Sequence, residues 1–486
     1  MFDQFETNSP LDKEQFESRA LQLRQELLKL QFALEKTRHP VIIVLAGLDG
    51  SGKGVVVHRL NEWMDPRGIE TNTYWEQSDE EDSRPYFWRF WQKLPARGRM
   101  GVFLGSWYTQ VTQQRLSGTA DDDTLSDFCQ RIVNFERQLS DDGAIVIKLW
   151  LHVSEETQRK QLEEKAPRRQ QNPRVTERPY ELVGKYQQAM AISETLIRDT
   201  QTLQCPWHII DAEDRYHRDI SAGEIIRDAI TRRLQHPEAQ QPPEPLPPSV
   251  NSLAGVELDK SLEKADYKRK LHKYQARLQD LAWEAYRQKR SLIAVFEGWD
   301  GSGKGSAIRR VTGAIDPRLY KIVQIAAPSD EELAHHYCWR FWRQLQRDGR
   351  ATLFDRSWYG RVMVKRVEGF ASEEEWTRAY REINEFEREL CLHGAIVTKF
   401  WLHISQEEQL ARFRARENEP HKRHKITEED WRNREKWPAY EEAVNDMIAR
   451  THSEQAPWTL VPGNNKYFAR IKILKTLCKT LEQALY

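Results

Sequence analysis

The chain of 486 residues carries 74 Lys and Arg against 74 Asp and Glu, so its formal net charge is zero. This balance does not favour general adsorption to nucleic acid or to a membrane, and we expect neither as a partner. No apolar run approaches the length of a membrane span, no apolar signal segment opens the chain, and the five cysteines form no C-x-x-C pair. We therefore expect a cytoplasmic protein with reduced thiols.

The first predicted element is an amphipathic helix near the N-terminus. Its apolar stripe falls on Phe16, Leu23, Leu27, Leu30 and Leu34. Such a stripe can pack on its own domain or form a dimer contact, and the sequence leaves both open.

A short apolar run at 41–45 follows, as is typical of a parallel strand buried on both faces. It leads into the loop Gly47–Gly54, which fits G-x-x-x-x-G-K but has Gly where Ser or Thr is usual. In such a loop backbone N–H groups turn inward around phosphate oxygens, and the lysine adds a point charge. The next residues show a helical stripe at Val57, Leu60 and Met64, facing the sheet.

Further strands are predicted at 102–104, 144–150 and 207–210, separated by helical segments. Strands that alternate with helices indicate a doubly wound parallel α/β sheet. A proline-rich stretch at 235–252 then interrupts the pattern. It is predicted to be an exposed, semi-rigid spacer, with a proline-rich docking ligand as the alternative.

The whole pattern returns 251 residues later, which indicates a tandem duplication of one domain of roughly 230 residues. We predict a first domain at 1–234, a linker at 235–252 and a second domain at 253–486. The repeated features include strands at 292–296, 353–355, 395–401 and 458–461, a helical stripe at Ile308, Val311 and Ile315, and the string Ser106-Trp107-Tyr108, which returns as Ser357-Trp358-Tyr359.

The second glycine loop runs from Gly298 to Gly305 and carries Lys304. Phosphoryl chemistry normally uses Mg²⁺ held by the loop Ser or Thr and by an Asp at the end of a neighbouring strand. Because Gly305 replaces the Ser or Thr, the metal must take more from carboxylates, and the loop Asp300 is the nearest candidate. Asp355 supplies the strand-end carboxylate, with a simple strand-end cap as the alternative.

Four cations follow Asp355, with no acidic residue from 356 to 367: Arg356, Arg361, Lys365 and Arg366. Their spacing can put several of them on one helical side. Unpaired cations beside a phosphate loop indicate a polyanionic substrate, and the alternative is a solvated basic face.

A second basic stretch spans 412–436, and Lys425 lies within it. We interpret it as a mobile lid that closes cations over phosphates. An ordinary solvated helix surface is the alternative, because acidic residues are interspersed.

The first half has lost the residues that would make it a catalyst. At the same offset Asp355 becomes Leu104, Arg356 becomes Gly105, Arg361 becomes Gln110, Lys365 becomes Gln114 and Glu297 becomes Ala46. Leucine cannot hold Mg²⁺, so metal-assisted transfer should fail in the first half. We expect a degenerate domain that serves packing, dimerisation or polyanion docking.

The motifs Glu297–Asp300, Gly303–Gly305 and Asp355–Arg361 resemble those of the polyphosphate kinase 2 family. The resemblance covers nearly the whole chain, and the tandem arrangement is similar to the two-domain members. It implies a P-loop kinase-like fold with a helical lid, and Mg²⁺-dependent transfer of a terminal phosphoryl group from inorganic polyphosphate to AMP, giving ADP.

The resemblance also implies roles for single residues. It makes Asp300 and Asp355 metal-binding and acceptor-orienting carboxylates, Lys304 the phosphate lysine, and Arg356 and Arg361 phosphate clamps. Lys365 stands where single-domain members often have Glu, which resembles the AMP-using subgroup. The remaining residues expected at the substrates are Glu297, Gly298, Gly301, Gly303, Gly305, Arg366 and Lys425.

Two other functions remain open at this stage. An ATP-dependent nucleoside monophosphate kinase would share the loop and the lid, and a non-catalytic regulatory protein would bind polyphosphate or nucleotide without turnover. We expect a homo-oligomer, although the sequence fixes neither the number of subunits nor the acceptor range beyond AMP.

Overall fold

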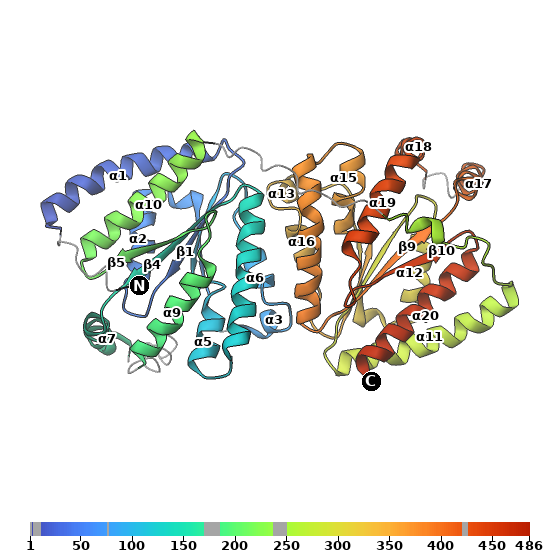
Figure 1. The fold of residues 1–486 in the computed structure, drawn as a ribbon, viewed down its shortest axis with the longest axis horizontal. Helices are drawn as coiled ribbons and strands as arrows, with labels where there is room; N and C mark the ends of the chain where they lie inside the picture. The colour runs from blue at the N-terminus through green and yellow to red at the C-terminus, as the bar shows by residue number, and fades with distance from the viewer. Residues whose placement is uncertain (1, 3–10, 75–76, 170–184, 237–249, 420–425) are drawn as a thin grey trace. The chain divides into compact units, whose positions relative to one another are not determined.

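The computed structural model describes residue 2 and residues 11–74, 77–169, 185–236, 250–419 and 426–486 (Figure 1). These residues form two compact units, one built mainly from the first half of the chain and the other mainly from the second. Within these ranges, no helix is both long and apolar enough to cross a lipid bilayer. Residues 237–249 of the predicted spacer lie outside the described residues, so its exposure stays a prediction.

The first unit is a five-stranded parallel sheet in the order β2-β3-β1-β4-β5. Its strands are β1 (Val41–Ala46), β2 (Ile69–Thr73), β3 (Met100–Leu104), β4 (Ile145–His152) and β5 (Trp207–Asp211). Helices α1 (Lys13–Leu34), α2 (Lys53–Trp63) and α10 (Arg215–Gln235) contact one another on one face. The other face carries α5 (Thr109–Leu116), α6 (Asp122–Asp141) and α9 (Tyr186–Thr200). The unit also contains α4 (Trp88–Trp91) and α7 (Glu155–Arg169), and α3 spans Asp79–Asp82.

The second unit repeats this design in the order β10-β9-β6-β8-β7. Its strands are β6 (Leu292–Gly298), β7 (Tyr320–Gln324), β8 (Ala351–Asp355), β9 (Ile396–His403) and β10 (Trp458–Pro462). Helices α11 (Lys264–Arg287), α12 (Lys304–Thr312) and α20 (Lys466–Leu485) pack together on one face. The other helices are α14 (Trp339–Trp342), α15 (Val364–Val367), α16 (Glu373–Leu392), α17 (Gln406–Glu417), α18 (Glu428–Glu435) and α19 (Trp437–Thr451), and α13 spans Asp330–Leu333.

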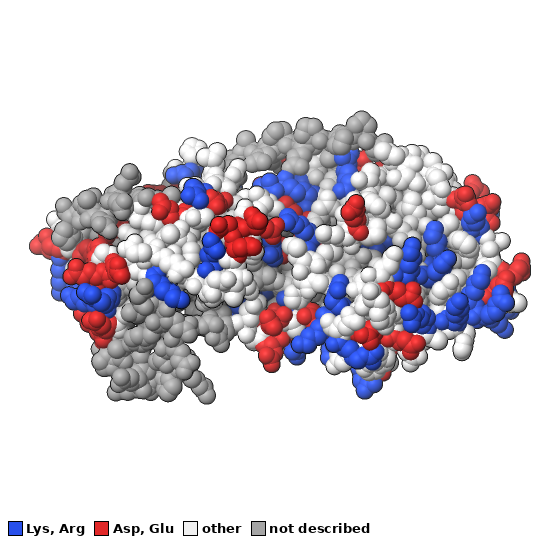
Figure 2. All heavy atoms as spheres, turned by 60° about the horizontal axis from the view of Figure 1, so that its bottom comes forward, with Lys and Arg blue, Asp and Glu red and all other residues white. Residues whose placement is uncertain are grey.

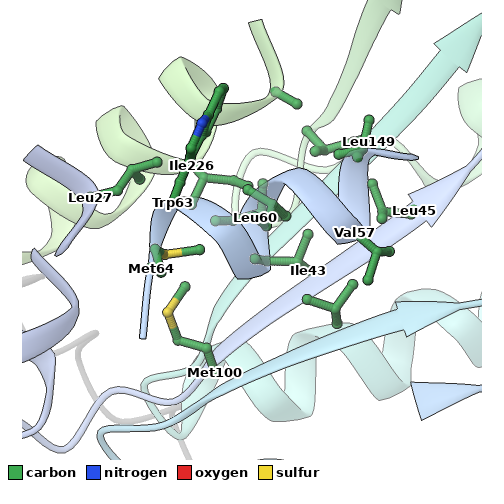
Figure 3. Packing of buried hydrophobic residues seen from close by; sticks show 14 of the residues in the cluster. Leu27, Ile43, Leu45, Val57, Leu60, Trp63, Met64, Met100, Leu149 and Ile226 are labelled. Carbon is green, nitrogen blue, oxygen red and sulfur yellow. The ribbon is translucent and has the colours of Figure 1, made fainter. Parts of the chain in front are cut away.

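The apolar stripes predicted from the sequence form the core on one face of each sheet. Val57, Leu60 and Met64 are buried in the first unit, and Ile308, Val311 and Ile315 are buried in the second. Figure 3 shows the first set packed between α2 and the strands, with Met64 facing Met100 of β3. The N-terminal helix α1 packs on α2 and α10 of its own unit, which accounts for its apolar stripe.

A buried ionic network lies on the opposite face of each sheet. In the second unit Lys399 Nζ is 2.7 Å from Glu387 Oε2, and the Tyr359 hydroxyl and Trp358 Nε1 donate to Glu387 Oε1 at 2.5 and 3.0 Å. Burial raises the pKa of Glu387 and lowers that of Lys399, and the pair opposes both shifts. The equivalent network in the first unit joins Lys148, Glu136, Tyr108 and Trp107.

Features that both units share can belong to the fold and not to the reaction. The Trp-Tyr pair and its buried Lys-Glu partners are present in both units, including the one that lacks Asp355, so we assign the network to the fold. The predicted doubly wound α/β class is confirmed. The edge strands β2 and β7 were not predicted from the sequence. They are short, and they expose Glu70, Thr71, Thr73 and Ile322.

Candidate active site

The second glycine loop joins the central strand β6 to helix α12. Gly298 and Gly303 have φ of +151° and +106°, backbone conformations that favour glycine. A Cβ atom on Gly298 would stand 2.6 Å from the carbonyl oxygen of Leu402, so a side chain does not fit. Lys304 Nζ donates to the carbonyl oxygens of Gly298 at 2.6 Å and of Trp299 at 3.3 Å. The lysine thus lies folded over its own loop.

The loop carboxylate Asp300 is held by two side chains from other elements. Arg356 Nη2 lies 3.1 Å from Oδ1, and Asn433 Nδ2 donates to Oδ2 at 2.9 Å. Burial works to raise the pKa of Asp300, but the charges of Lys304 and Arg356 and the Asn433 hydrogen bond outweigh it, so this pKa lies below its ordinary value. Asp300 is therefore a carboxylate in the folded protein.

Asp355 ends strand β8 beside the start of α12. Its Oδ2 lies 3.9 Å from the position that a Cβ atom on Gly305 would take. Gly305 occupies the place of the usual loop Ser or Thr, so the carboxylate faces the space that such a side chain would fill. No hydrogen bond or ion pair of the Asp355 side chain occurs among the described residues, which leaves its oxygens available to a ligand.

Glu297 is buried behind the loop. Ser357 Oγ donates to Glu297 Oε1 at 2.7 Å. Burial raises the pKa of Glu297, while the Ser357 hydrogen bond and the charges of Lys304 and Arg356 oppose the rise. Glu297 thereby ties the segment after β8 to the glycine loop.

Arg356 holds a backbone conformation that L-amino acids rarely adopt. Its φ is +64°, and Lys289 is the other non-glycine residue with positive φ among the described residues. The equivalent Gly105 has φ of +68°, so both units make the same turn and only the first relieves it with glycine. Left-handed conformations cost a side-chain-bearing residue roughly 1–2 kcal/mol. Strain of this kind is often retained at functional sites.

Two of the other three predicted cations pair with acidic side chains. Arg361 forms an ion pair with Glu375 at 3.1 Å, and Arg366 pairs with Asp446 at 2.7 Å and Glu442 at 2.9 Å. The expectation that the cations after Asp355 are unpaired is therefore wrong for these two arginines, and it is also wrong for Arg356, which pairs with Asp300. The sequence near them has no acid, but α16 and α19 bring carboxylates from far along the chain, as buried charge requires.

Neither arginine lines the cavity beside the loop, and neither does Lys365, which lies on α15. Their role at the substrates stays a prediction. Lys425 lies outside the described residues.

A cavity opens beside the loop, and several of its lining residues were not predicted as site residues. Its walls are Glu297, Gly298, Trp299, Asp300, Lys304, Arg356, Gly360, Met363, Val364, Trp401, Gln409, Asn433 and Tyr440. Five of the predicted site residues thus meet in one place: Gly298 and the acidic and basic side chains at 297, 300, 304 and 356.

Aromatic rings form one wall of this cavity. Trp299 stacks on Trp437 with ring centroids 3.7 Å apart and planes 12° apart. Trp299 Nε1 donates to His403 Nδ1 at 3.0 Å, and Trp401 Nε1 approaches the same atom at 3.5 Å. Burial lowers the pKa of His403 to about 4, so the imidazole is neutral near pH 7 and its Nδ1 can accept.

Arg412 was expected in the mobile lid, but it is buried and fixed beneath the loop. Its guanidinium donates to the carbonyl oxygens of Gly301 and Ser302 at 3.0 and 2.9 Å, and to those of Gly463 and Asn464 at 2.7 and 3.0 Å. It therefore supports the loop from α17 and does not present a free cation to a substrate.

Asn433 links helix α18 to the loop. Besides its bond to Asp300, its Oδ1 lies 3.2 Å from the hydroxyl of Tyr440. That hydroxyl is 3.3 Å from Glu368 Oε1, and Lys436 Nζ is 2.9 Å from Glu368 Oε2. A lone Asn on a charged helix carries no sequence signal for such a contact, because Asp300 lies 133 positions away.

The first unit keeps its glycine loop but not this arrangement. Lys53 Nζ donates to the carbonyl oxygens of Gly47 and Leu48 at 2.5 and 3.1 Å, and lies 3.5 Å from Asp49 Oδ1. With glycine at position 105, Asp49 has no counterpart of Arg356. The guanidinium of Arg218 packs against Gly52 so closely that a Cβ atom there would lie 2.2 Å from it.

Phe2 covers the aromatic pair of the first unit. Its ring stacks on His152 at 4.9 Å and lies 5.7 Å from the ring of Trp150. Trp150 and His152 are the counterparts of Trp401 and His403, which Trp299 contacts in the second unit. Since Leu48 replaces that tryptophan, a residue from the N-terminus supplies the missing ring.

No group of three or more His, Cys, Asp or Glu that could hold a metal ion occurs in the described ranges. Mg²⁺ is commonly held by one or two carboxylates together with substrate phosphates, so it needs no such group. A parallel sheet whose central strand leads into a glycine loop and a helix, with a strand-end carboxylate beside the loop, defines the P-loop class of phosphate-binding proteins.

Comparisons with known proteins narrow this class to one family. Residues 10–238 and 261–485 each match the sequence profile of the polyphosphate kinase 2 family. A polyphosphate:AMP phosphotransferase of Pseudomonas aeruginosa is 44% identical over 100% of this chain and 99% of its own length. One from Acinetobacter johnsonii is 37% identical over 95% of this chain and 96% of its own length.

A solved structure agrees with the sequence comparison. The crystal structure of a Pseudomonas aeruginosa PA01 protein assigned as a polyphosphate kinase 2 is 44% identical, with a TM-score of 0.89 over 100% of this chain and 99% of that one. The chain belongs to the polyphosphate kinase 2 family.

Proposed function

We propose that the protein transfers the terminal phosphoryl group of inorganic polyphosphate to AMP, giving ADP, and that its second unit carries the reaction. The observation that carries the proposal is the meeting of Asp300, Lys304 and Arg356 at the glycine loop, with Asp355 beside it. Relatives named polyphosphate:AMP phosphotransferase, which match over nearly the full chain, supply the donor and the acceptor.

The reaction exchanges one P–O bond for another. The bond from the terminal phosphorus to its bridging oxygen breaks, and its electron pair stays on the shortened polyphosphate. The same phosphorus bonds to an oxygen of the AMP phosphate. A phosphate monoester has its second pKa at about 6, so this oxygen carries no proton near neutral pH. No general base is required, which fits the structural position of Glu297 under Ser357.

The protein's part in this chemistry is positioning and neutralisation of charge. Two oxyanions must approach in line, and their repulsion opposes the near-attack geometry. Lys304 and Arg356 place positive charge at the loop, and loop N–H groups face the phosphate oxygens. Asp300 in turn orients Arg356 through their 3.1 Å contact.

A divalent metal, which we propose is Mg²⁺, fits the carboxylates at this edge of the sheet. Asp355 would hold it directly, because its oxygens have no partner among the described residues, and Asp300 is the second carboxylate. The bound metal would neutralise phosphoryl oxygens in the transition state. With Gly305 in place of Ser or Thr, more of the coordination falls to these two side chains.

The first unit is proposed to be non-catalytic. Leu104 stands in place of Asp355 and Gly105 in place of Arg356. Lys53 faces Asp49 there, and Phe2 covers Trp150 and His152. Its retained core and buried network suit a role in packing or assembly.

We also propose a cytoplasmic location, a homo-oligomeric assembly and no nucleic-acid partner. A cytoplasmic location agrees with the five free cysteines. A homo-oligomeric assembly and the absence of nucleic-acid partners rest on the expectations from the sequence.

The test is to mix the protein with AMP, Mg²⁺ and long-chain polyphosphate in the absence of ATP and to measure ADP. The proposal predicts ADP that requires both Mg²⁺ and polyphosphate. Faster transfer from ATP alone would identify a nucleoside monophosphate kinase. Binding of polyphosphate or nucleotide without turnover would identify a regulatory protein.

A further inference from the structure

Helices α11 and α20 of the second unit carry an excess of positive charge. Helix α11 has seven Lys and Arg against three Asp and Glu, and α20 has five against one, a combined net charge of +8. Figure 2 shows blue side chains gathered on the right of the view, where these helices lie. The counterparts α1 and α10 together have nine Lys and Arg against six Asp and Glu, a net charge of +3.

Part of this charge lines the seam between the two helices. Arg277 of α11 and Glu482 of α20 form an ion pair at 2.5 Å across the seam. Lys270, Lys273 and Arg277 share one side of α11 because they are spaced at i, i+3 and i+7. Lys475, Lys479 and Glu482 share one side of α20 by their i, i+4, i+7 spacing. Four lysines therefore border the same seam.

These lysines are not neutralised by the protein. Lys273, Lys475 and Lys479 are exposed, and Lys270 is half-buried. No ion pair or hydrogen bond of their ammonium groups occurs among the described residues. A basic surface can simply be solvated. Unpaired lysines that continue away from a phosphate site can, however, bind the rest of the substrate if that substrate is a long polyanion.

Side-chain contacts connect the seam to the glycine loop. Arg470, on α20, has Nη2 3.4 Å from Oγ of Ser306 in the first turn of α12, and its guanidinium lies over the ring of Tyr267 at 5.9 Å. Tyr267 of α11 stacks on Tyr467 of α20 at 4.5 Å. The N-terminal ends of all three helices therefore lie together beside the loop, and the lysines continue from that end along the seam.

We propose that this lysine seam, formed by Lys270, Lys273, Lys475 and Lys479, binds the part of the polyphosphate chain that trails away from the reacting end. The inference rests on the proposed polyphosphate donor. From Arg470 to Lys479 the seam extends roughly 14 Å along α20 at the rise of an α-helix. Tripolyphosphate seated at the loop is too short to reach along it, whereas long-chain polyphosphate can.

The proposal predicts a dependence on chain length. Replacing all four lysines (Lys270→Gln, Lys273→Gln, Lys475→Gln and Lys479→Gln) should raise the KM for long-chain polyphosphate by about tenfold or more at low salt. Each lost phosphate contact removes roughly 0.7 from the slope of log affinity against log salt, by analogy with single-stranded nucleic acid. The KM for tripolyphosphate, the KM for AMP and kcat should not change.

A matched variant removes the same charge from the first unit. Lys13, Arg24, Lys29 and Lys36 are exposed on or just after the equivalent helix α1, and their replacement by Gln should leave every KM unchanged. Replacement of the four seam lysines by Arg should preserve the KM for long chains. If the fourfold variant melts at a lower temperature than the wild-type protein, the double variant Lys475→Gln/Lys479→Gln is measured in its place. Its slope of log affinity against log salt should fall by about half as much.

Equal KM values for long-chain polyphosphate in the seam variant and the α1 variant would overturn the inference. So would a seam variant that loses affinity for DNA while it keeps its KM for long-chain polyphosphate. Failure of the wild-type protein to use any polyphosphate would instead overturn the proposed function, so the two failures are distinguishable.

Discussion

Replacing Arg356 by glycine should make the protein more stable than replacing it by alanine, while both changes abolish most activity. Arg356 has φ of +64°, and the first unit makes the same turn with Gly105 at φ of +68°. Arg356→Ala retains the strained backbone, whereas Arg356→Gly relieves it. Left-handed backbone costs a residue with a side chain roughly 1–2 kcal/mol, but glycine also makes the unfolded chain more flexible, which offsets part of the relief. We therefore expect the free energy of unfolding of Arg356→Gly to exceed that of Arg356→Ala by about 1 kcal/mol.

Both variants lose the charge that Arg356 brings to Asp300 and to the loop. Removing one preorganised donor at a site of developing charge costs about 10²–10³ in kcat. The measurements are urea unfolding of the three proteins and initial rates of ADP formation at saturating substrates. A glycine variant less stable than the alanine variant would refute the assignment of strain. A glycine variant with wild-type activity would refute the role of the arginine in transfer.

Two further predictions concern stability. Lys399→Met should lower the free energy of unfolding in urea by about 3–5 kcal/mol, because it leaves Glu387 buried without its partner. Adding Glu387→Gln should recover part of this loss, and a double variant as unstable as the single variant would contradict the reasoning. His403 titrates at about 4 in the folded protein and about 6.5 unfolded, so the unfolded chain binds more protons between these values and stability should fall by up to about 3 kcal/mol as pH drops from 6.5 to 4. His403→Asn should flatten that fall, and an unchanged pH profile would contradict the cause.

The fold was largely predictable because its signals are local and repeated. The apolar run before each glycine loop, the helical stripes of Val57 and Ile308, and the constant offset between halves all recur, so one half checks the other. Strands β2 and β7 escaped because an edge strand needs few apolar residues. Their pairing with β3 and β8 comes from tertiary structure.

The residues of the candidate site were predictable only where they belong to a short sequence motif. Asp300, Lys304 and Arg356 meet at the cavity as expected. The partners of Arg361 and Arg366 were not visible, because Glu375 and Asp446 come from helices that only the fold brings close.

The same reason hid three other features of the site. The hydrogen bond of Asn433 to Asp300, the stacking of Trp437 on Trp299 and the fixed position of Arg412 all join segments distant in sequence. Residue type alone does not predict such contacts.

The central claim is that the second unit transfers the phosphoryl group and the first does not. The most direct measurement compares Lys304→Ala with Lys53→Ala, the same substitution at equivalent positions of the two duplicated loops. With AMP and long-chain polyphosphate saturating, Lys304→Ala should lower initial ADP formation by about 10²–10³, whereas Lys53→Ala should change it only a few-fold, with melting temperature as the folding control. A well-folded Lys53→Ala protein as inactive as Lys304→Ala would contradict the claim and make the first unit catalytic despite Leu104.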